Sequence, residues 1–280
     1  MSKGLLDPKV DFVFKNIFGS PNHPEILISF LNATLKAKKK IVNVDIKKTD
    51  IEKQYIEDKY SRLDVKATTS NDEIINIEIQ LKNENNMVKR SLYYLSKMYE
   101  EQLNEKEDYS KLVRTVCINI LNFKYLKTDN FHTGYRFKEI ESNEELTDIM
   151  EVHFIEIPKL QDSSDEKDML VAWTEFLKDP ESEKVRGLEL SIEEIRQAKD
   201  ELIRMSNDST QRELYDMRAN SLRDKMSELN AAEKKGIEKG REEGREEEKI
   251  KIARNMKLNG LDTNTIAKIT NLSEDEIDKL

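Results

Sequence analysis

The feature that most constrains the fold is the apolar run from Val113 to Phe123, which reads VRTVCINILNF and is rich in β-branched residues. Such a run predicts a strand that is buried on both faces. It follows a segment whose apolar residues recur at spacings of three and four, which predicts an amphipathic helix over 86–103. A helix between two strands implies a crossover connection, and therefore parallel neighbours in a sheet that is covered by helices.

The segments around this core alternate between periods of two and of three to four residues. Alternation predicts strands, and the polar cluster at 69–73 predicts a hairpin turn between the second and third of them. The predicted order is α-β-β-β-α-β, an α/β fold with a mixed sheet. The predicted helices lie over 11–18, 23–35 and 86–103, the last with an apolar face of Val88, Leu92, Leu95, Tyr99 and Leu103, and the predicted strands over 41–46, 60–67, 74–81, 113–123, 135–140 and 151–157.

Beyond about residue 162 strand patterns end and helical patterns begin. Residues 231–250 carry seven acidic and six basic side chains, with a glycine at every fourth position from Gly236 to Gly244, which predicts a solvated helix. The last residues predict two short helices joined at 270–272, with Ser273 as an N-cap. Such a pair is either a small helix-turn-helix unit or a cap for packing or oligomerisation. We expect a first domain over 1–160, a helical extension over 161–230, and a charged segment with a small helical unit over 231–280.

Composition excludes several classes of protein. No apolar run reaches the roughly 18–20 residues of a membrane span, and the first residues lack the apolar core of a signal peptide, so we expect a cytoplasmic protein. A single cysteine, Cys117, excludes a disulfide framework, and its apolar surroundings predict a buried, inert thiol. The net charge is −9, but residues 1–100 hold 17 basic and 14 acidic side chains, so the negative charge lies in the remainder.

The chemistry concentrates in the hairpin. If its turn centres on Asn71, Asp64 lies directly opposite Glu78, with Cβ atoms about 5 Å apart. Two carboxylates at this distance repel each other unless a cation lies between them, and oxygen ligands suit Mg²⁺ or Mn²⁺. The backbone carbonyl of Ile79 would complete the site. The alternative is an ordinary hairpin whose polar face meets solvent, but strand 74–81 is predicted to be central, where a carboxylate is costly without a partner.

These residues resemble a known family. The spacing of Asp64 and Glu78-Ile79-Gln80 is similar to the motif of the PD-(D/E)XK nuclease superfamily, with Gln80 in place of the usual lysine. Residues 7–19 (DPKVDFVFKNIFG), residues 90–97 (RSLYYLSK) and the glycine-repeat tail narrow the resemblance to the recombination-promoting nucleases and transposases of the Rpn family. The resemblance extends over nearly the whole chain and is firmest over 5–125.

The resemblance implies a restriction-endonuclease-like fold over 1–160 and a bacterial, Mg²⁺- or Mn²⁺-dependent DNA endonuclease that promotes recombination or transposition. By position, Asp64, Glu78 and Ile79 would hold the metal, Gln80 would take the third motif position, and Asp11 would contribute indirectly. Glutamine can orient water but carries no charge. Lys66 and Lys82 lie on the predicted site face, and supplying the missing cation would be an improvised role for either. The phosphate contacts expected on double-stranded DNA are Lys82, Lys89, Arg90 and Lys97.

Two other interpretations stay open at this point. The chain is a catalytically degenerate relative that binds DNA or a protein, which the glutamine and the acidic C-terminal half favour. Alternatively, it is chiefly an oligomerisation device, with the helices over 191–250 as its active part. A homodimer is expected of the nuclease as well, because cutting both strands is simplest with two sites related by a twofold axis.

Overall fold

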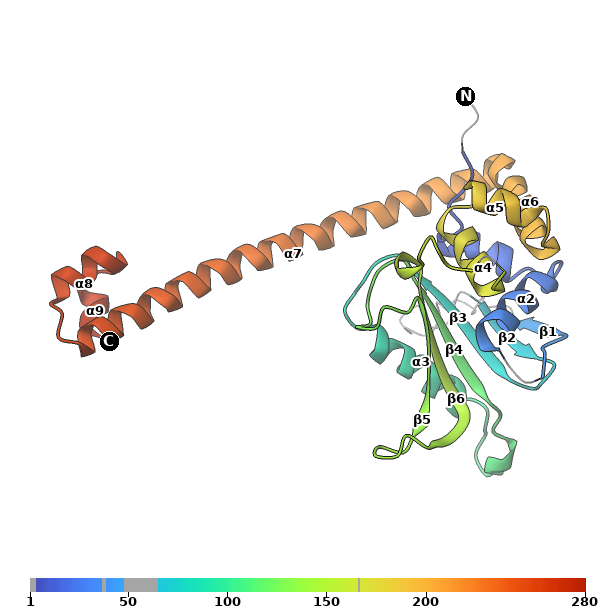
Figure 1. Cartoon of the computed structure of the whole chain (residues 1–280), viewed down its shortest axis with the longest axis horizontal. Coiled ribbons are helices and arrows are strands. Elements are labelled where there is room, and N and C mark those ends of the chain that lie inside the picture. The colour runs from blue at the N-terminus through green and yellow to red at the C-terminus, as the bar shows by residue number, and fades with distance from the viewer. Residues whose placement is uncertain (1–3, 37–38, 48–64, 166) are drawn as a thin grey trace. The chain divides into compact units, whose positions relative to one another are not determined.

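The computed structural model of the chain describes residues 4–36, 39–47, 65–165 and 167–280. Within them, six strands form one mixed sheet in the order β1-β2-β3-β4-β6-β5 (Figure 1). Strands β1 to β3 are antiparallel, β3, β4 and β6 are parallel, and β5 runs antiparallel to β6 at the edge. The strands are β1 Val44–Lys47, β2 Val65–Thr69, β3 Ile74–Gln80, β4 Thr115–Leu121, β5 His132–Lys138 and β6 Glu145–Glu156.

The predicted crossover is confirmed. Every residue of β4 is buried, and β4 runs parallel to β3 with α3 between them in the chain. The helices are α1 Asp11–Phe18, α2 Pro24–Leu35, α3 Met87–Glu100, α4 Met169–Lys178, α5 Glu183–Glu189, α6 Glu193–Asn207, α7 Ser209–Leu258, α8 Thr263–Thr270 and α9 Glu274–Asp278. Helices α1, α2 and α4 gather on one side of the sheet, with α5 and α6 outside them, and α3 lies on the other (Figure 1).

Aromatic side chains form the centre of the helical side. Phe18 at the end of α1 meets Phe14, Phe30 and Trp173 with ring centroids 4.5, 5.4 and 5.3 Å apart. The indole Nε1 of Trp173 donates to Ser29 Oγ at 3.2 Å, so the polar atom of this buried ring has a partner. Helix α4 therefore shares one core with the first two helices of the chain.

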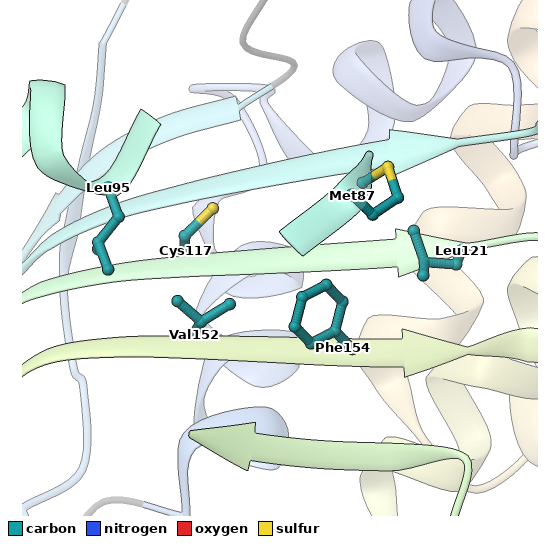
Figure 2. Packing of buried hydrophobic residues seen from close by; sticks show 6 residues of the cluster. All are labelled: Met87, Leu95, Cys117, Leu121, Val152 and Phe154. Atoms are coloured by element: carbon teal, nitrogen blue, oxygen red, sulfur yellow. The ribbon is translucent and has the colours of Figure 1, made fainter. Parts of the chain in front are cut away.

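The sequence predicted the buried face of α3 wrongly over part of the helix. Val88 and Leu92 are 40% and 48% exposed, and the buried residues are Met87, Ser91, Tyr94, Leu95 and Met98. Met87 and Leu95 pack on Cys117 and Leu121 of β4 and on Val152 and Phe154 of β6 (Figure 2). The helix is rotated toward the polar residues of the sheet beneath it, because those buried groups require hydrogen-bond partners.

Several strand bounds differ from prediction, among them β5, which covers His132–Lys138 rather than 135–140. Two of the differences have identifiable reasons. Residue Ile41 is buried but not in a strand, because the Asn32 side chain of α2 bonds both its N–H and its carbonyl, at 2.9 and 2.8 Å. Strand β6 begins at Glu145 rather than 151, since its first half pairs with β5 in a hairpin and is largely exposed. An exposed strand has no alternating apolar face for a sequence to display.

The chain divides into two compact units, Met1–Ala219 and Asn220–Leu280. The second contains most of α7, with α8 and α9 packed on its end through Ala253, Ile266, Leu272 and Ile277. The predicted short helices are confirmed, including the Ser273–Glu276 capping box. Between them, Asn271 takes a left-handed conformation (φ 56°). Among the described residues, no helix is long and apolar enough to cross a membrane.

Candidate active site

The β2–β3 hairpin has the register that the site prediction requires. Val65 pairs with Ile77 and Lys66 with Asn76, across a turn in which Asp72 takes a positive φ of 59°. This is the register of a turn centred on Asn71, for which Asp64 was predicted opposite Glu78. Asp64 itself lies outside the described residues.

The two faces of β3 meet different surroundings. Ile75, Ile77 and Ile79 are buried on the side of α1, whereas Asn76 and Glu78 are buried beneath α3. The predicted central position of the strand is confirmed, since β3 lies between β2 and β4. The polar face of the hairpin is therefore covered over β3, and a buried carboxylate there needs a cationic or hydrogen-bonded partner.

Glu78 finds this partner in Arg90, at the start of α3. The Arg90 Nε donates to Oε2 at 3.2 Å and a terminal nitrogen donates to Oε1 at 3.3 Å. The Glu78 side chain is 0% exposed and that of Arg90 25%. Burial raises the pKa of the Glu78 carboxyl above its usual range, and the hydrogen bonds and charge of Arg90 act against this rise.

From the sequence, Arg90 was expected to contact a DNA phosphate, and its pairing with Glu78 was not predicted. The sequence did contain a signal for it. A carboxylate on a covered strand takes its cation from the element that covers it, and Arg90 lies on the covering helix, one turn before the buried Tyr94. The guanidinium carbon lies 5.1 Å from the centre of the Tyr94 ring. Arg90 is thus held by both a carboxylate and an aromatic face.

A row of neutral polar groups continues from Glu78 under α3. Ser91 Oγ donates to the carbonyl of Met87 at 2.7 Å and lies 2.9 Å from Asn119 Oδ1, while Asn119 Nδ2 donates to the carbonyl of His153 at 3.1 Å. Asn76 Oδ1 is buried and has no hydrogen-bond partner. The row therefore includes a side-chain oxygen that is free to accept.

The thiol of Cys117 lies in the same row, 4.0 Å from Asn76 Nδ2. It is fully buried, and burial, together with the charge of Glu78, raises the pKa of the thiol to about 12. The predicted inert cysteine is confirmed. The thiolate, which is the form that binds metals and attacks electrophiles, is therefore disfavoured here.

The remaining motif residues lie near the end of β3. Gln80 is half-buried on the α3 face, and Ile79 is 5% exposed. Lys66 of β2 lies 3.8 Å from Glu101 at the end of α3, and Lys82 is half-buried just beyond the strand. The cation that the structure brings to Glu78 is thus Arg90, neither of the lysines considered from sequence.

The other predicted phosphate contacts follow α3. Lys89 is exposed beside Arg90, and Lys97 is half-buried, 3.9 and 3.8 Å from Glu100 and Glu101. Lys82, Lys89 and Arg90 cluster near the start of the helix in sequence, where the β3 strand has just ended. Lys97 lies two turns further on, among carboxylates.

Asp11 is placed apart from this group. It begins α1, the helix on the other side of the sheet, and its Oδ2 accepts from Arg218 of α7 at 2.8 Å. The Arg218 guanidinium also lies 5.6 Å from the ring of Phe12. The ion pair of Asp11 and Arg218 therefore joins α1 to the start of α7.

The chemistry of the donors fits a hard divalent cation. Glu78, Asn76 and Gln80 offer oxygens from one strand, and the buried Glu78 carboxylate already binds a cation in Arg90. Within the described ranges, no three His, Cys, Asp or Glu side chains are grouped to hold a metal. A second acidic ligand would have to come from the segment that contains Asp64.

Two family models match the chain. One, described as PD-(D/E)XK nuclease family transposase, matches residues 8–232, and the other, described as Rpn/YhgA-like nuclease family, C-terminal HTH domain, matches residues 246–280. Searches of curated proteins and of solved structures found no match. The first model spans the sheet, the helices around it and the start of α7, and the second spans the end of α7 with α8 and α9.

Proposed function

The chain belongs to the PD-(D/E)XK nuclease family transposases, with an Rpn-type C-terminal helix-turn-helix domain, and on this basis we propose that it is a metal-dependent DNA endonuclease that promotes recombination or transposition. The observation that carries the proposal is Glu78, a fully buried carboxylate in a central strand, two residues before Gln80 on the same face. Its reaction is the hydrolysis of phosphodiester bonds in double-stranded DNA, in the bacterial cytoplasm.

Each predicted site residue has its own role in the proposed phosphodiester hydrolysis. Asp64, Glu78 and the carbonyl of Ile79 would hold Mg²⁺ or Mn²⁺, and the bound ion would supply an acidified water and offset charge on the phosphate. Gln80 orients the attacking water through its amide, because it lacks the charge of the usual lysine. Lys82, Lys89, Arg90 and Lys97 contact backbone phosphates, which positions the duplex without reading its sequence. The indirect part predicted for Asp11 stays a prediction.

The C-terminal unit adds a second DNA contact. Its α9 is acidic at Glu274, Asp275, Glu276 and Asp278, and carboxylates so placed repel phosphates. We therefore propose that the basic residues at the end of α7 and in α8, including Lys251, Arg254 and Lys268, approach the duplex. The exposed length of α7 joins two copies into a dimer with two cutting sites.

The test is a supercoiled-plasmid assay with the full chain in Mg²⁺, Mn²⁺, Ca²⁺ or EDTA. Asp64→Ala and Glu78→Gln are expected to abolish nicking in Mg²⁺ and Mn²⁺. Glu78→Gln keeps the size of the side chain and a hydrogen bond to Arg90. Glu105→Gln, an exposed change just beyond α3, is the matched control and should cut like the wild type. Cleavage by Glu78→Gln at the wild-type rate would refute the proposed site.

A second candidate is favoured by the Glu78–Arg90 pair itself. A carboxylate already neutralised by a guanidinium is what a degenerate, DNA-binding relative would also have. Calorimetric titration with Mg²⁺ separates the two. Binding heat that disappears in Glu78→Gln supports the nuclease, and its absence in the wild type supports the degenerate relative.

A further inference from the structure

The ion pair of Glu78 and Arg90 is asymmetric. The carboxylate is 0% exposed, whereas the guanidinium side chain is 25% exposed and stands at the start of α3 beside the exposed Lys89. One end of the pair is therefore fixed inside the sheet, and the other is within reach of a ligand at the surface.

The pair is also loose. Its two nitrogen–oxygen distances are 3.2 and 3.3 Å, whereas charge-assisted bonds of this kind are usually about 2.7–2.9 Å long. The guanidinium has a second support in the buried Tyr94 ring, at 5.1 Å. Arg90 can leave the carboxylate without losing every favourable contact that holds it.

We propose that Arg90 exchanges between Glu78 and a backbone phosphate of DNA, so that a divalent cation on Glu78 and DNA at the surface each strengthen the binding of the other. This inference rests on the proposed function, since it takes Glu78 as the cation ligand. A divalent cation on Glu78 repels a guanidinium that shares the same carboxylate. A phosphate offers that guanidinium an equal negative charge, and a fork geometry that suits it.

The exchange predicts a measurable coupling. In the absence of DNA, the cation must displace Arg90 from Glu78, which weakens its binding. In the presence of DNA, Arg90 is already held by phosphate, and the cation binds tighter by about tenfold. By linkage, the cation tightens DNA binding by the same factor.

The experiment measures binding rather than cleavage, with Ca²⁺ as the cation and a short DNA duplex as the ligand. Calorimetry gives the Ca²⁺ affinity of the full chain with and without the duplex, and fluorescence anisotropy gives the duplex affinity with and without Ca²⁺. Arg90→Met should bind Ca²⁺ tighter than the wild type when DNA is absent, and should show no coupling. Lys89→Met, the matched control, should weaken DNA binding and keep the coupling.

Two further conditions make the outcome decisive. The titrations are repeated at higher pH, because an unpaired buried carboxyl takes up a proton that the cation must displace. If Arg90→Met does not fold, Arg90→Gln keeps a hydrogen bond to Glu78 without the charge, and should also lose the coupling.

The possible failures are distinguishable. Coupling that persists in the Arg90 variants would overturn the exchange while leaving the proposed metal site intact. Ca²⁺ binding that is unchanged in Glu78→Gln would overturn the proposed function, and the exchange with it.

Discussion

Cys117 shows at the scale of one residue how burial decides chemistry. Its side chain is fully buried beneath α3 and its thiol pKa is raised to about 12, so the reactive thiolate is absent at neutral pH. A reactive cysteine is usually partly exposed in an electropositive setting, whereas Cys117 is fully buried and desolvated. The residue fills space between β4 and the helix.

The first prediction follows from that burial. An aromatic disulfide reagent is expected to label native protein only as fast as the sheet opens, and to label urea-unfolded protein at once. The measurement is the absorbance of the released thiolate over time. Rapid labelling of the native chain would show that α3 does not cover Cys117 in solution.

His132 is the second residue whose surroundings set its protonation. Burial, reinforced by the neighbouring His153 and Lys36, lowers its pKa from 6.5 to about 4. Its ring bonds His153 at 2.9 Å, and His153 bonds Glu151 at 2.7 Å. The hydrogen-bonded chain joins the edge strand β5 to β6. The charged groups Asp168 and Glu151 also act on His132, in the opposite direction to Lys36.

The pH dependence follows with a definite sign. Between about pH 6.5 and pH 4 the unfolded chain protonates His132 and the folded chain does not, so the free energy of unfolding falls as pH falls. The loss is of order 2 kcal/mol. His132→Gln should remove this part of the fall. It should retain the part below pH 4.5 from Glu151, whose pKa is lowered to about 2 by His153 and Arg114 although burial opposes this. Urea unfolding at several pH values measures the contributions of His132 and of Glu151. If the free energy of unfolding depended on pH equally in the two proteins above pH 4.5, the assignment would be contradicted.

At the scale of one element, β5 depends on a residue with no side chain. A Cβ on Gly134 would lie 3.1 Å from Cε1 and 3.3 Å from Nδ1 of His153. That ring is held on both nitrogens by His132 and Glu151, so it has little freedom to move aside. The close approach of β5 to β6 therefore requires glycine here.

The matched pair of substitutions is Gly134→Ala and Gly187→Ala. The first should lower the free energy of unfolding by about 1 kcal/mol, because crowding outweighs the entropic gain. The second lies in α5 with no atom within 4 Å of its added Cβ, and should raise stability by about 0.5–1 kcal/mol. Thermal and urea unfolding measure both. A stabilised Gly134→Ala would mean that the ring moves freely.

At the scale of the whole molecule, the first unit carries its own core. The start of α7 belongs to it: Arg212 donates to the carbonyls of Gly4 and Ser206, and Arg218 pairs with Asp11. A chain that ends at Ala219 keeps these contacts and every strand of the described sheet. Its melting temperature should stay within about 4 °C of the full chain's.

The same truncation should weaken binding of a DNA duplex by about tenfold or more, since it removes the helix-turn-helix domain. Circular dichroism and fluorescence anisotropy on the truncated and full chains test the two expectations separately. Loss of cooperative melting would show that the first unit depends on the second. Unchanged DNA affinity would remove the DNA-binding role proposed for the second unit.

The proposed dimer gives a further expectation for α7. Met226, Leu229 and Ile237 are 39%, 37% and 50% exposed along this helix. Ile237→Lys should shift the chain from dimer to monomer in sedimentation velocity, because a charge in an apolar contact is costly to bury. Lys239→Ala, an exposed change two residues away, is the control. A wild-type chain that sediments as a monomer would contradict the dimer.

By itself the sequence determined the order of the elements, the central buried strand β4, the hairpin register and the capped helices at the end of the chain. These features depend on alternation, spacing and local capping, which involve residues that are close together in the sequence. The buried, inert Cys117 was predicted for the same reason, since its neighbours along one strand are apolar.

Only the tertiary structure decided how α3 is turned and which cation Glu78 receives. Apolar spacing favoured a face with Val88 and Leu92, but the sheet beneath presents Asn76, Glu78 and Asn119, and the helix turns Arg90 and Ser91 toward them. The partners of buried polar groups come from residues distant in sequence, so one segment's pattern cannot specify them. The sequence predicted the candidate site as a pair of carboxylates, Asp64 and Glu78, and the arginine that pairs with Glu78 became visible only when strand and helix were packed together.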